Sequence, residues 1–210
     1  MQIISINLGK ARKIIRKNVE RTTGIYKQPV DGPVSATLLG LVNDVIADKK
    51  HHGGFDQALY LYGQTDYDWW MNELGRELTP GTFGENLTVS EFESASFQIG
   101  DTLLIGDVIL QVTSPRIPCA TLSARMDDPK FVKRFRHAER PGLYCRVLQE
   151  GTIQTGMTVR VEPYQGQTVS LLDMYRDVYT PDNSESGLRR FLAAPIDERT
   201  RAKKEKLLAG

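Results

Sequence analysis

Short apolar runs separated by turn residues fill most of residues 1–164, and this pattern constrains the fold more than any other feature. Ile4, Ile6 and Leu8 alternate with polar residues, as in a half-buried strand. Gly106-Asp107 is a two-residue hairpin signal between two further runs. Many short strands with frequent turns predict a β-barrel or sandwich rather than a parallel α/β sheet. The further predicted strands are 34–39, 42–46, 86–89, 102–105, 108–113, 143–148 and 158–161.

Two segments with helical spacing interrupt the predicted strands. Residues 57–78 carry apolar side chains at three- and four-residue intervals and end before Pro80-Gly81. Residues 120–137 favour two short helices that break at Asp128-Pro129. The predicted fold class is therefore mainly β with α insertions (α+β), built around a barrel.

The pattern changes at Gln165, where strand alternation gives way to helical spacing. Pro181 and Pro195 divide this tail into three short helices, and Ser170 is a candidate N-cap for the first. We therefore predict two units, a β-barrel domain over 1–164 and a three-helix extension over 165–210. Because the extension is too short for a large core, it must pack on the barrel or on a partner chain, and a homodimer would satisfy this need.

The composition excludes several classes of protein. Lys and Arg number 27 and Asp and Glu 26 in 210 residues, so the chain lacks the basic excess typical of a nucleic-acid binder. No stretch approaches the ~18–20 apolar residues that a membrane helix needs. The first ten residues lack the features of a secretion signal, which favours a cytoplasmic protein. In that compartment we expect Cys119 and Cys145 to be reduced.

The segment Ser114-Pro-Arg-Ile-Pro-Cys119 has the greatest potential for chemistry. Its two prolines predict a stiff loop that leaves the strand at 108–113 and places Cys119 at the start of the next helix. A helix N-terminus and a cation such as Arg116 or Arg125 both stabilise a thiolate. A thiolate attacks electrophiles or binds soft metals, whereas the alternative is a buried cysteine in a tight turn. The residues alone leave both interpretations open.

A second candidate segment is Lys49-Lys-His-His-Gly-Gly-Phe-Asp-Gln-Ala58. Its paired glycines allow the backbone to approach a ligand closely and to present N–H groups to an anion. Lys50 and His52 add positive or donor groups beside them, although a solvated basic turn is the alternative for the first histidine. Adjacent histidines do not have the spacing of a zinc site. Asp56 is predicted to cap the helix that follows.

Two weaker candidates follow along the chain. In Gly81-Thr-Phe-Gly-Glu-Asn-Leu-Thr88, the glycines can direct Glu85 and Asn86 into a cleft, but a turn with a satisfied glutamate is the alternative. In Pro141-Gly-Leu-Tyr-Cys-Arg146, the cysteine lies in an apolar strand and is predicted to be core. Arg146 would bind either an anion or a surface carboxylate.

In this order the segments resemble a known family. The runs His52–Ala58, Phe83–Thr88, Ile99-Gly-Asp101, Ser114–Cys119 and Gly142–Val147 are similar to the motifs of the MOSC domain, named for the C-terminal domain of molybdenum cofactor sulfurase. The helical tail is similar to the three-helix extension of YiiM-type bacterial members. This chain has Asn43-Asp44 where the family often has Gly-Asp. It has Thr121 where a lysine often follows the ligand cysteine.

The resemblance implies a MOSC-type β-barrel, a molybdopterin-bound molybdenum and Cys119 as the thiolate ligand of that metal. It also implies reduction of N-hydroxylated compounds such as 6-hydroxylaminopurine. For such a reaction His52 and Glu85 are the candidate sources of protons. Arg125 would replace the family's lysine at the cofactor phosphate. The candidate cofactor-binding residues are Lys50, Gly53, Gly54, Asn86, Arg116, Arg125 and Arg146.

The leading hypothesis is therefore a cytoplasmic molybdenum-dependent oxidoreductase. The sequence contains no flavin or nicotinamide fingerprint and no cysteine set for an iron–sulfur cluster, so electrons must come from a separate reductase. The alternatives are a persulfide relay at Cys119 and a non-catalytic carrier of molybdopterin or another anion. Pyridoxal phosphate, which sulfurase relatives suggest, is disfavoured because no lysine is expected to be buried.

Overall fold

The computed structural model describes residues 1–16, 19–47 and 53–210. The strands are β1 (Ile3–Gly9), β2 (Arg12–Arg16), β3 (Val19–Thr23), β4 (Lys27–Val30), β5 (Val34–Thr37), β6 (Gly40–Leu41), β7 (Leu59–Gly63), β8 (Leu87–Val89), β9 (Thr102–Ile105), β10 (Val108–Pro115), β11 (Leu143–Gln149), β12 (Gly151–Ile153) and β13 (Arg160–Glu162). The helices are α1 (Gln64–Leu74), α2 (Ala120–Met126), α3 (Phe131–Ala138), α4 (Leu171–Asp177), α5 (Glu185–Ala193) and α6 (Glu198–Leu208), with short 3-10 helices at Phe55–Gln57 and Ser94–Ser96.

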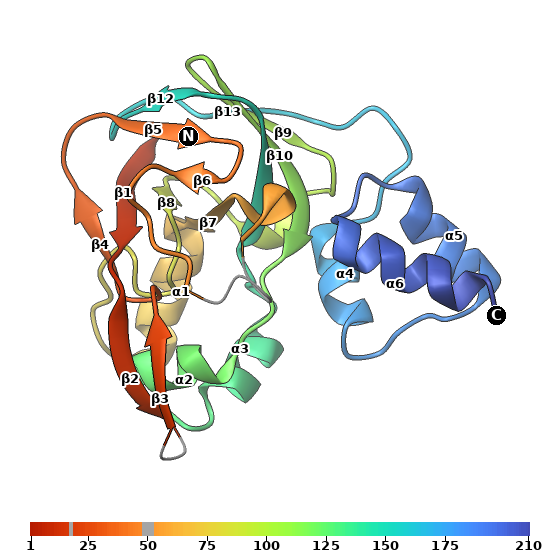
Figure 1. The fold of residues 1–210 in the computed structure, drawn as a ribbon, viewed down its shortest axis with the longest axis horizontal. Helices are drawn as coiled ribbons and strands as arrows, with labels where there is room; N and C mark the ends of the chain where they lie inside the picture. The colour runs from red at the N-terminus through yellow and green to blue at the C-terminus, as the bar shows by residue number, and fades with distance from the viewer. Residues whose placement is uncertain (17–18, 48–52) are drawn as a thin grey trace.

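One large sheet organises the molecule. Its strand order is β13-β9-β10-β11-β7-β8-β1-β4, and only the β7–β8 pair is parallel within it. A three-stranded sheet, β12-β5-β6, and the β2–β3 hairpin complete the strands (Figure 1). The outer strands β13 and β4 are not paired with each other in the described ranges. The mixed sheet-and-helix fold is thus confirmed, whereas the predicted closed barrel is not found.

The first strand corrects the predicted alternation. Ile3 and Ile6 are buried, but Ile4 is exposed. The pairing of β1 with β8 shifts register between Ile3 and Ser5, as at a bulge, and such a shift breaks the two-residue period. The existence of the strand was therefore predictable from the sequence, but its buried face was not.

The predicted helix at residues 57–78 is wrong over its first seven residues, 57–63. Leu59–Gly63 forms β7, and α1 begins only at Gln64 and ends at Leu74. All five residues of β7 are buried, because the strand lies inside the large sheet between β11 and β8. A strand covered on both faces has no polar alternation, so its sequence is hard to distinguish from a helix.

The strand predicted at 42–46 is also wrong. Only Gly40–Leu41 pairs there, as β6, and a turn follows. The sequence patterns did not predict the β2–β3 hairpin, β4 or β12. These strands lie in small sheets or at the edge of the large one, where burial imposes a weaker pattern.

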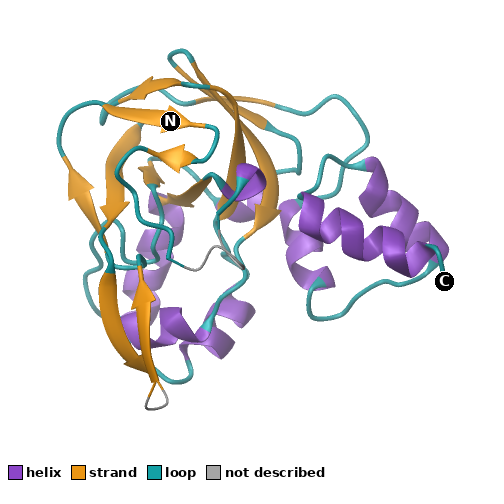
Figure 2. Cartoon of the chain, in the orientation of Figure 1, coloured by secondary structure: helices purple, strands orange, loops and turns teal. Residues whose placement is uncertain are grey.

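The three C-terminal helices begin and end where the prolines predicted. Ser170, Ser184 and Asp197 each accept a hydrogen bond from a backbone N–H in the first turn of α4, α5 and α6. The helices gather beside β10 (Figure 2), and Leu171 and Phe191 belong to the same apolar core as the large sheet. The extension therefore packs on the sheet domain. Within the described ranges, the structure has no helix long and apolar enough to cross a membrane.

Candidate functional site

Cys119 lies where its flanking prolines predicted. Strand β10 runs through Pro115, a short loop follows, and Cys119 is the N-cap residue of α2 with an extended backbone. Its carbonyl accepts the N–H of Leu122 at 2.9 Å, and the residue is half-buried. A helix start beside a guanidinium stabilises a thiolate, so this position suits a reactive or metal-binding sulfur. Cys145 differs, because it is fully buried in β11 and burial raises the pKa of its thiol well above the ordinary value.

Arg116 is a buried cation at the centre of the site. Its side chain is only 3% exposed, and its guanidinium lies over the ring of Tyr60, with 5.2 Å between Cζ and the ring centroid. Burial lowers the pKa of this group, but the surrounding phenols and the Cys119 thiol outweigh that effect and raise it. Nη1 has no hydrogen-bond partner in the described ranges, where no carboxylate forms an ion pair with it. A buried guanidinium without a counter-charge is costly, and the unpartnered Nη1 of Arg116 leaves a donor that an anion could accept from.

Tyrosines surround Arg116. Tyr60 and Tyr144 are cross-strand partners on β7 and β11, with ring centroids 5.1 Å apart. The Tyr60 hydroxyl donates to the carbonyl of Pro141 at 2.9 Å. Gly142 follows with a φ of 65°, and a Cβ there would lie 2.6 Å from the Tyr60 ring. The tyrosine alternation in β7 and the glycine before β11 were the signals that could have predicted this packing.

Glu85 lies in a closed polar pocket. Its Oε1 accepts hydrogen bonds from the Tyr67 hydroxyl at 2.6 Å, the Gly81 N–H at 2.6 Å and the Thr88 hydroxyl at 2.8 Å. Its Oε2 is buried and has no partner in the described ranges. Burial raises the pKa of the carboxyl group, and these hydrogen bonds only partly oppose the shift. The alternative prediction, a turn glutamate with all its hydrogen bonds made, therefore holds for Oε1 and not for Oε2.

This raised pKa predicts a specific pH dependence of stability. In the folded chain Glu85 keeps its proton above the pKa of an exposed glutamate, so the native state binds more protons than the unfolded state. Its contribution to stability is thus present below the unfolded pKa of ~4.3 and is lost as pH rises through the folded pKa. We expect Glu85→Gln, which cannot ionise, to gain stability relative to the wild type between pH 4.5 and neutrality. Urea denaturation of both proteins across that range measures the difference, and a constant difference would contradict the shift.

Asn86 is held entirely by the protein. Its side-chain oxygen accepts the N–H of Tyr60 at 3.1 Å, and its amide nitrogen donates to Asp44 at 2.9 Å. Asp44 also accepts the N–H of Gly9 and pairs with the buried ammonium of Lys27. Asn43 has a φ of 68°, so it takes the left-handed backbone that a glycine would supply, and the Asn-Asp pair preserves the turn.

The buried Lys27 corrects one premise of the sequence analysis. The sequence was expected to have no buried lysine, but Lys27 and Lys204 are both buried. Burial lowers the pKa of Lys27, an effect that the charge of Asp44 opposes. Both ammonium groups are in ion pairs, with Asp44 and Asp177 respectively. The argument against pyridoxal phosphate therefore cannot rest on a lack of buried lysines.

The glycine pair adopts a backbone conformation that other residues rarely take. Gly53 and Gly54 have φ values of 75° and 87°, which disfavour other residues. Asp56 does not cap the helix that follows it. Its Oδ2 instead accepts the N–H of Glu198 at 2.7 Å, at the start of α6. Lys50 and His52 lie outside the described residues, so their predicted roles have no structural test.

The two remaining arginines make contacts within the protein. Arg125 lies over the ring of Tyr26 at 4.6 Å, and its Nε donates to the carbonyl of Thr82 at 3.5 Å. Arg146 pairs with Asp56 at 3.0 Å and donates to the carbonyl of Ile196 at 3.2 Å. Arg146 therefore joins β11 to the C-terminal helices. Arg146 was predicted to bind either an anion or a carboxylate of the protein, and in the structure it binds the carboxylate of Asp56.

The site thus brings together Cys119, Arg116 and the surrounding tyrosines on a mixed sheet-and-helix domain. The described residues contain no group of three or more His, Cys, Asp or Glu side chains that could hold a metal ion. The site therefore places a half-buried thiol close to a buried guanidinium. The family model of the MOSC domain matches residues 48–160, which include this site. The chain belongs to the MOSC domain family.

Similar proteins extend this finding. The chain is 30% identical to the uncharacterized protein YflK of Bacillus subtilis (strain 168) over 211 residues, covering 98% of this chain and 96% of that protein. A protein named reductase from Gibberella moniliformis (strain M3125 / FGSC 7600) is 36% identical over 151 residues, covering 69% of this chain and 27% of that longer protein. The crystal structure of YiiM from Geobacillus stearothermophilus is 28% identical with a TM-score of 0.81, covering 99% of this chain and 98% of that one. The predicted similarity to YiiM-type members is therefore confirmed.

Proposed function

We propose that this chain is a molybdenum-cofactor-dependent reductase of N-hydroxylated compounds such as 6-hydroxylaminopurine. The observation that carries the proposal is the pairing of half-buried Cys119 with buried Arg116, whose Nη1 has no partner in the described ranges. Membership of the MOSC domain family supports the cofactor, and the relative named reductase supports the reaction class.

The residues present fit the cofactor. The sulfur of Cys119 would hold molybdenum, because thiolates are soft ligands. The unpartnered Nη1 of Arg116 would hold an anionic group of the pterin through a charge-assisted hydrogen bond. When bound, the cofactor would supply two-electron reduction.

The remaining chemistry falls to protons and to a donor protein. Breaking the N–O bond of an R–NHOH group requires two electrons and two protons and yields R–NH₂ and water. A separate reductase would provide the electrons. Glu85 is fully buried, which raises the pKa of its carboxyl group and keeps that group from touching the substrate. We therefore assign direct proton donation to His52 and keep Glu85 as a supporting group.

Purification from two hosts tests the proposal. The chain from a host that makes molybdopterin should contain bound molybdenum and should reduce 6-hydroxylaminopurine with a supplied reductase. The chain from a host that cannot make molybdopterin should do neither. Bound molybdenum without turnover would favour the carrier function, and sulfur bound to Cys119 without molybdenum would favour the persulfide relay. Both results would contradict the proposal.

A further inference from the structure

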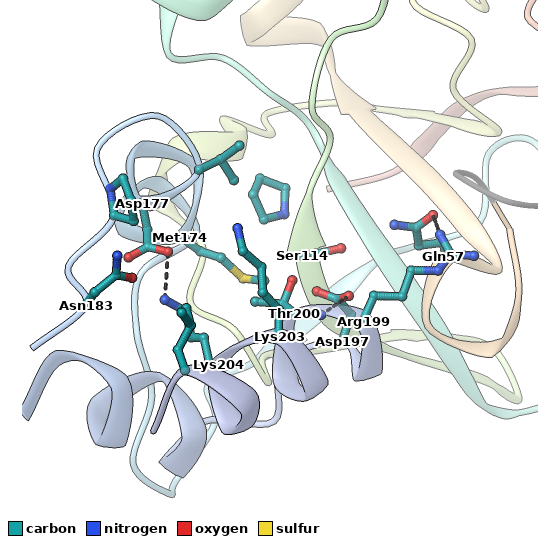
Figure 3. Close-up of a pocket in the computed structure, with 14 residues that line it drawn as sticks. Gln57, Ser114, Met174, Asp177, Asn183, Asp197, Arg199, Thr200, Lys203 and Lys204 are labelled. Atoms are coloured by element: carbon teal, nitrogen blue, oxygen red, sulfur yellow. Dashed lines mark hydrogen bonds and ion pairs between the residues drawn. The ribbon is translucent and has the colours of Figure 1, made fainter. Parts of the chain in front are cut away.

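A pocket of about 250 Å³ lies between the end of β10 and the helices α4 and α6 (Figure 3). Its walls are apolar at Pro115, Met174 and Val178. Its polar lining comes from strand, loop and helix together. The charged and polar lining residues that matter here are Ser114, Asp177, Asp197, Arg199, Lys203 and Lys204.

The carboxylates of the pocket already have partners. Asp177 pairs with the buried ammonium of Lys204 at 2.7 Å. Asp197 accepts the N–H of Thr200 at 3.0 Å as the N-cap of α6, and burial raises the pKa of its carboxyl group. Both carboxylates of the pocket are therefore already bonded to other groups of the protein.

The remaining lining offers a cation and a hydroxyl. Lys203 is exposed and forms no ion pair in the described part of the chain. Ser114 is only 5% exposed, and its hydroxyl oxygen is buried without a hydrogen-bond partner in the same ranges. A buried hydroxyl without a protein partner is available to hydrogen-bond a ligand or an ordered water. The ammonium of Lys203 and the hydroxyl of Ser114 both line this pocket, and both are groups that can donate a hydrogen bond to an oxyanion.

The pocket adjoins the Cys119 site. Ser114 belongs to the segment that ends in Cys119, and it is the cross-strand partner of Tyr144. Arg199 donates to Gln57 at 3.2 Å and to the carbonyl of Gly53 at 3.3 Å, so α6 contacts the glycine loop. The charges of Arg116, Cys119 and Arg199 all act on the Tyr144 phenol. Tyr144 is therefore a neighbour of the Cys119 site and, through its pairing with Ser114, of the pocket.

We propose that this pocket binds the phosphate group of the substrate, so that the preferred substrates are N-hydroxylated nucleotides rather than free bases. The inference rests on the proposed function for the reaction, and on Lys203 and Ser114 for the recognition of phosphate. Pockets for whole ligands measure roughly 300–1,000 Å³. The smaller volume here suits part of a ligand, such as a sugar phosphate whose base extends toward Tyr144.

Direct binding of ribose 5-phosphate tests the pocket without any reaction. In calorimetry we expect the wild type to bind it with a Kd of ~1 mM or tighter and ribose not at all. Lys203→Met should weaken binding about tenfold by removing a charge-assisted hydrogen bond. Ser114→Ala should also weaken it. Lys206→Met is the matched control, because Lys206 is an exposed lysine of the same helix outside the pocket. Equal binding in the two lysine variants, or no binding by the wild type, overturns the inference.

Kinetics with the loaded enzyme separate the inference from the proposed function. We expect Lys203→Met to raise the KM for an N-hydroxylated nucleoside monophosphate and to leave the KM for the free base unchanged. Reduction of the free base without ribose 5-phosphate binding would retain the proposed function and overturn the inference. Binding of ribose 5-phosphate without reduction of any N-hydroxylated compound would overturn the proposed function and retain the phosphate site.

Discussion

Cys119→Ser is expected to remove bound molybdenum and N-hydroxyl reduction together, while the free energy of unfolding stays within about 1 kcal/mol of the wild type. A serine hydroxyl stays protonated near neutral pH and is a hard ligand, so it is a poor substitute for a thiolate on molybdenum. Folding should be spared, because position 119 is the N-cap of α2 and serine is a favoured N-cap residue. Metal analysis, activity and urea denaturation of the same preparation measure the three quantities.

Cys145→Ser is the matched control. Its sulfur lies in the core of β11, so a hydroxyl there should reduce stability by about 1–3 kcal/mol and leave bound molybdenum in place. The same change from cysteine to serine is therefore expected to remove bound molybdenum at position 119 and to leave it in place at position 145. Molybdenum retained in Cys119→Ser would contradict the assignment of the ligand.

Local chemistry predicted much of this structure. The break at Asp128-Pro129 separates α2 from α3, and Pro181 and Pro195 lie in the turns between the C-terminal helices. The prolines before Cys119 also predicted its place at a helix start. In each case a proline restricts its own backbone and that of the residue before it, so the sequence alone predicts the result.

The surroundings of Arg116 required information that local patterns lack. Its partner Tyr60 lies on β7, which was predicted as helix because burial on both faces removes the strand pattern. Tyr144 reaches the same place only through the register that pairs β11 with β7. Long-range strand pairing is set by the whole sheet, so the motif could indicate Arg116 but not its aromatic surroundings.

The buried ion pair of Lys27 and Asp44 is connected to the Arg116 site by a series of contacts. Their side chains are 8% and 2% exposed, and neither residue was a candidate in the sequence. Asp44 binds Asn86, Asn86 binds the N–H of Tyr60, and the Tyr60 ring lies under Arg116. Removing the carboxylate charge would therefore disturb both folding and the position of the cation.

We expect Asp44→Asn to destabilise the protein by about 3–5 kcal/mol at pH 7, because it leaves the Lys27 ammonium buried without a counter-charge. Burial already lowers the pKa of Lys27 and Asp44 opposes that shift, so the folded pKa should fall further in the variant. The unfolded chain then binds more protons than the folded one up to pH ~10.4, and the variant's stability should rise toward that pH.

Urea denaturation at pH 7 and near pH 10 tests both parts of this prediction, the loss of stability and its partial recovery. The matched control is the double variant Lys27→Met with Asp44→Asn, which removes both charges but keeps an amide oxygen for the N–H of Gly9. It should regain part of the lost stability, because no uncompensated ammonium is left in the interior. Its stability should also lack the rise with pH, because no buried amine is left to titrate. An Asp44→Asn protein as stable as the wild type would mean that water reaches Lys27. In that case the charge of Asp44 would not be what fixes the positions of Asn86, Tyr60 and Arg116.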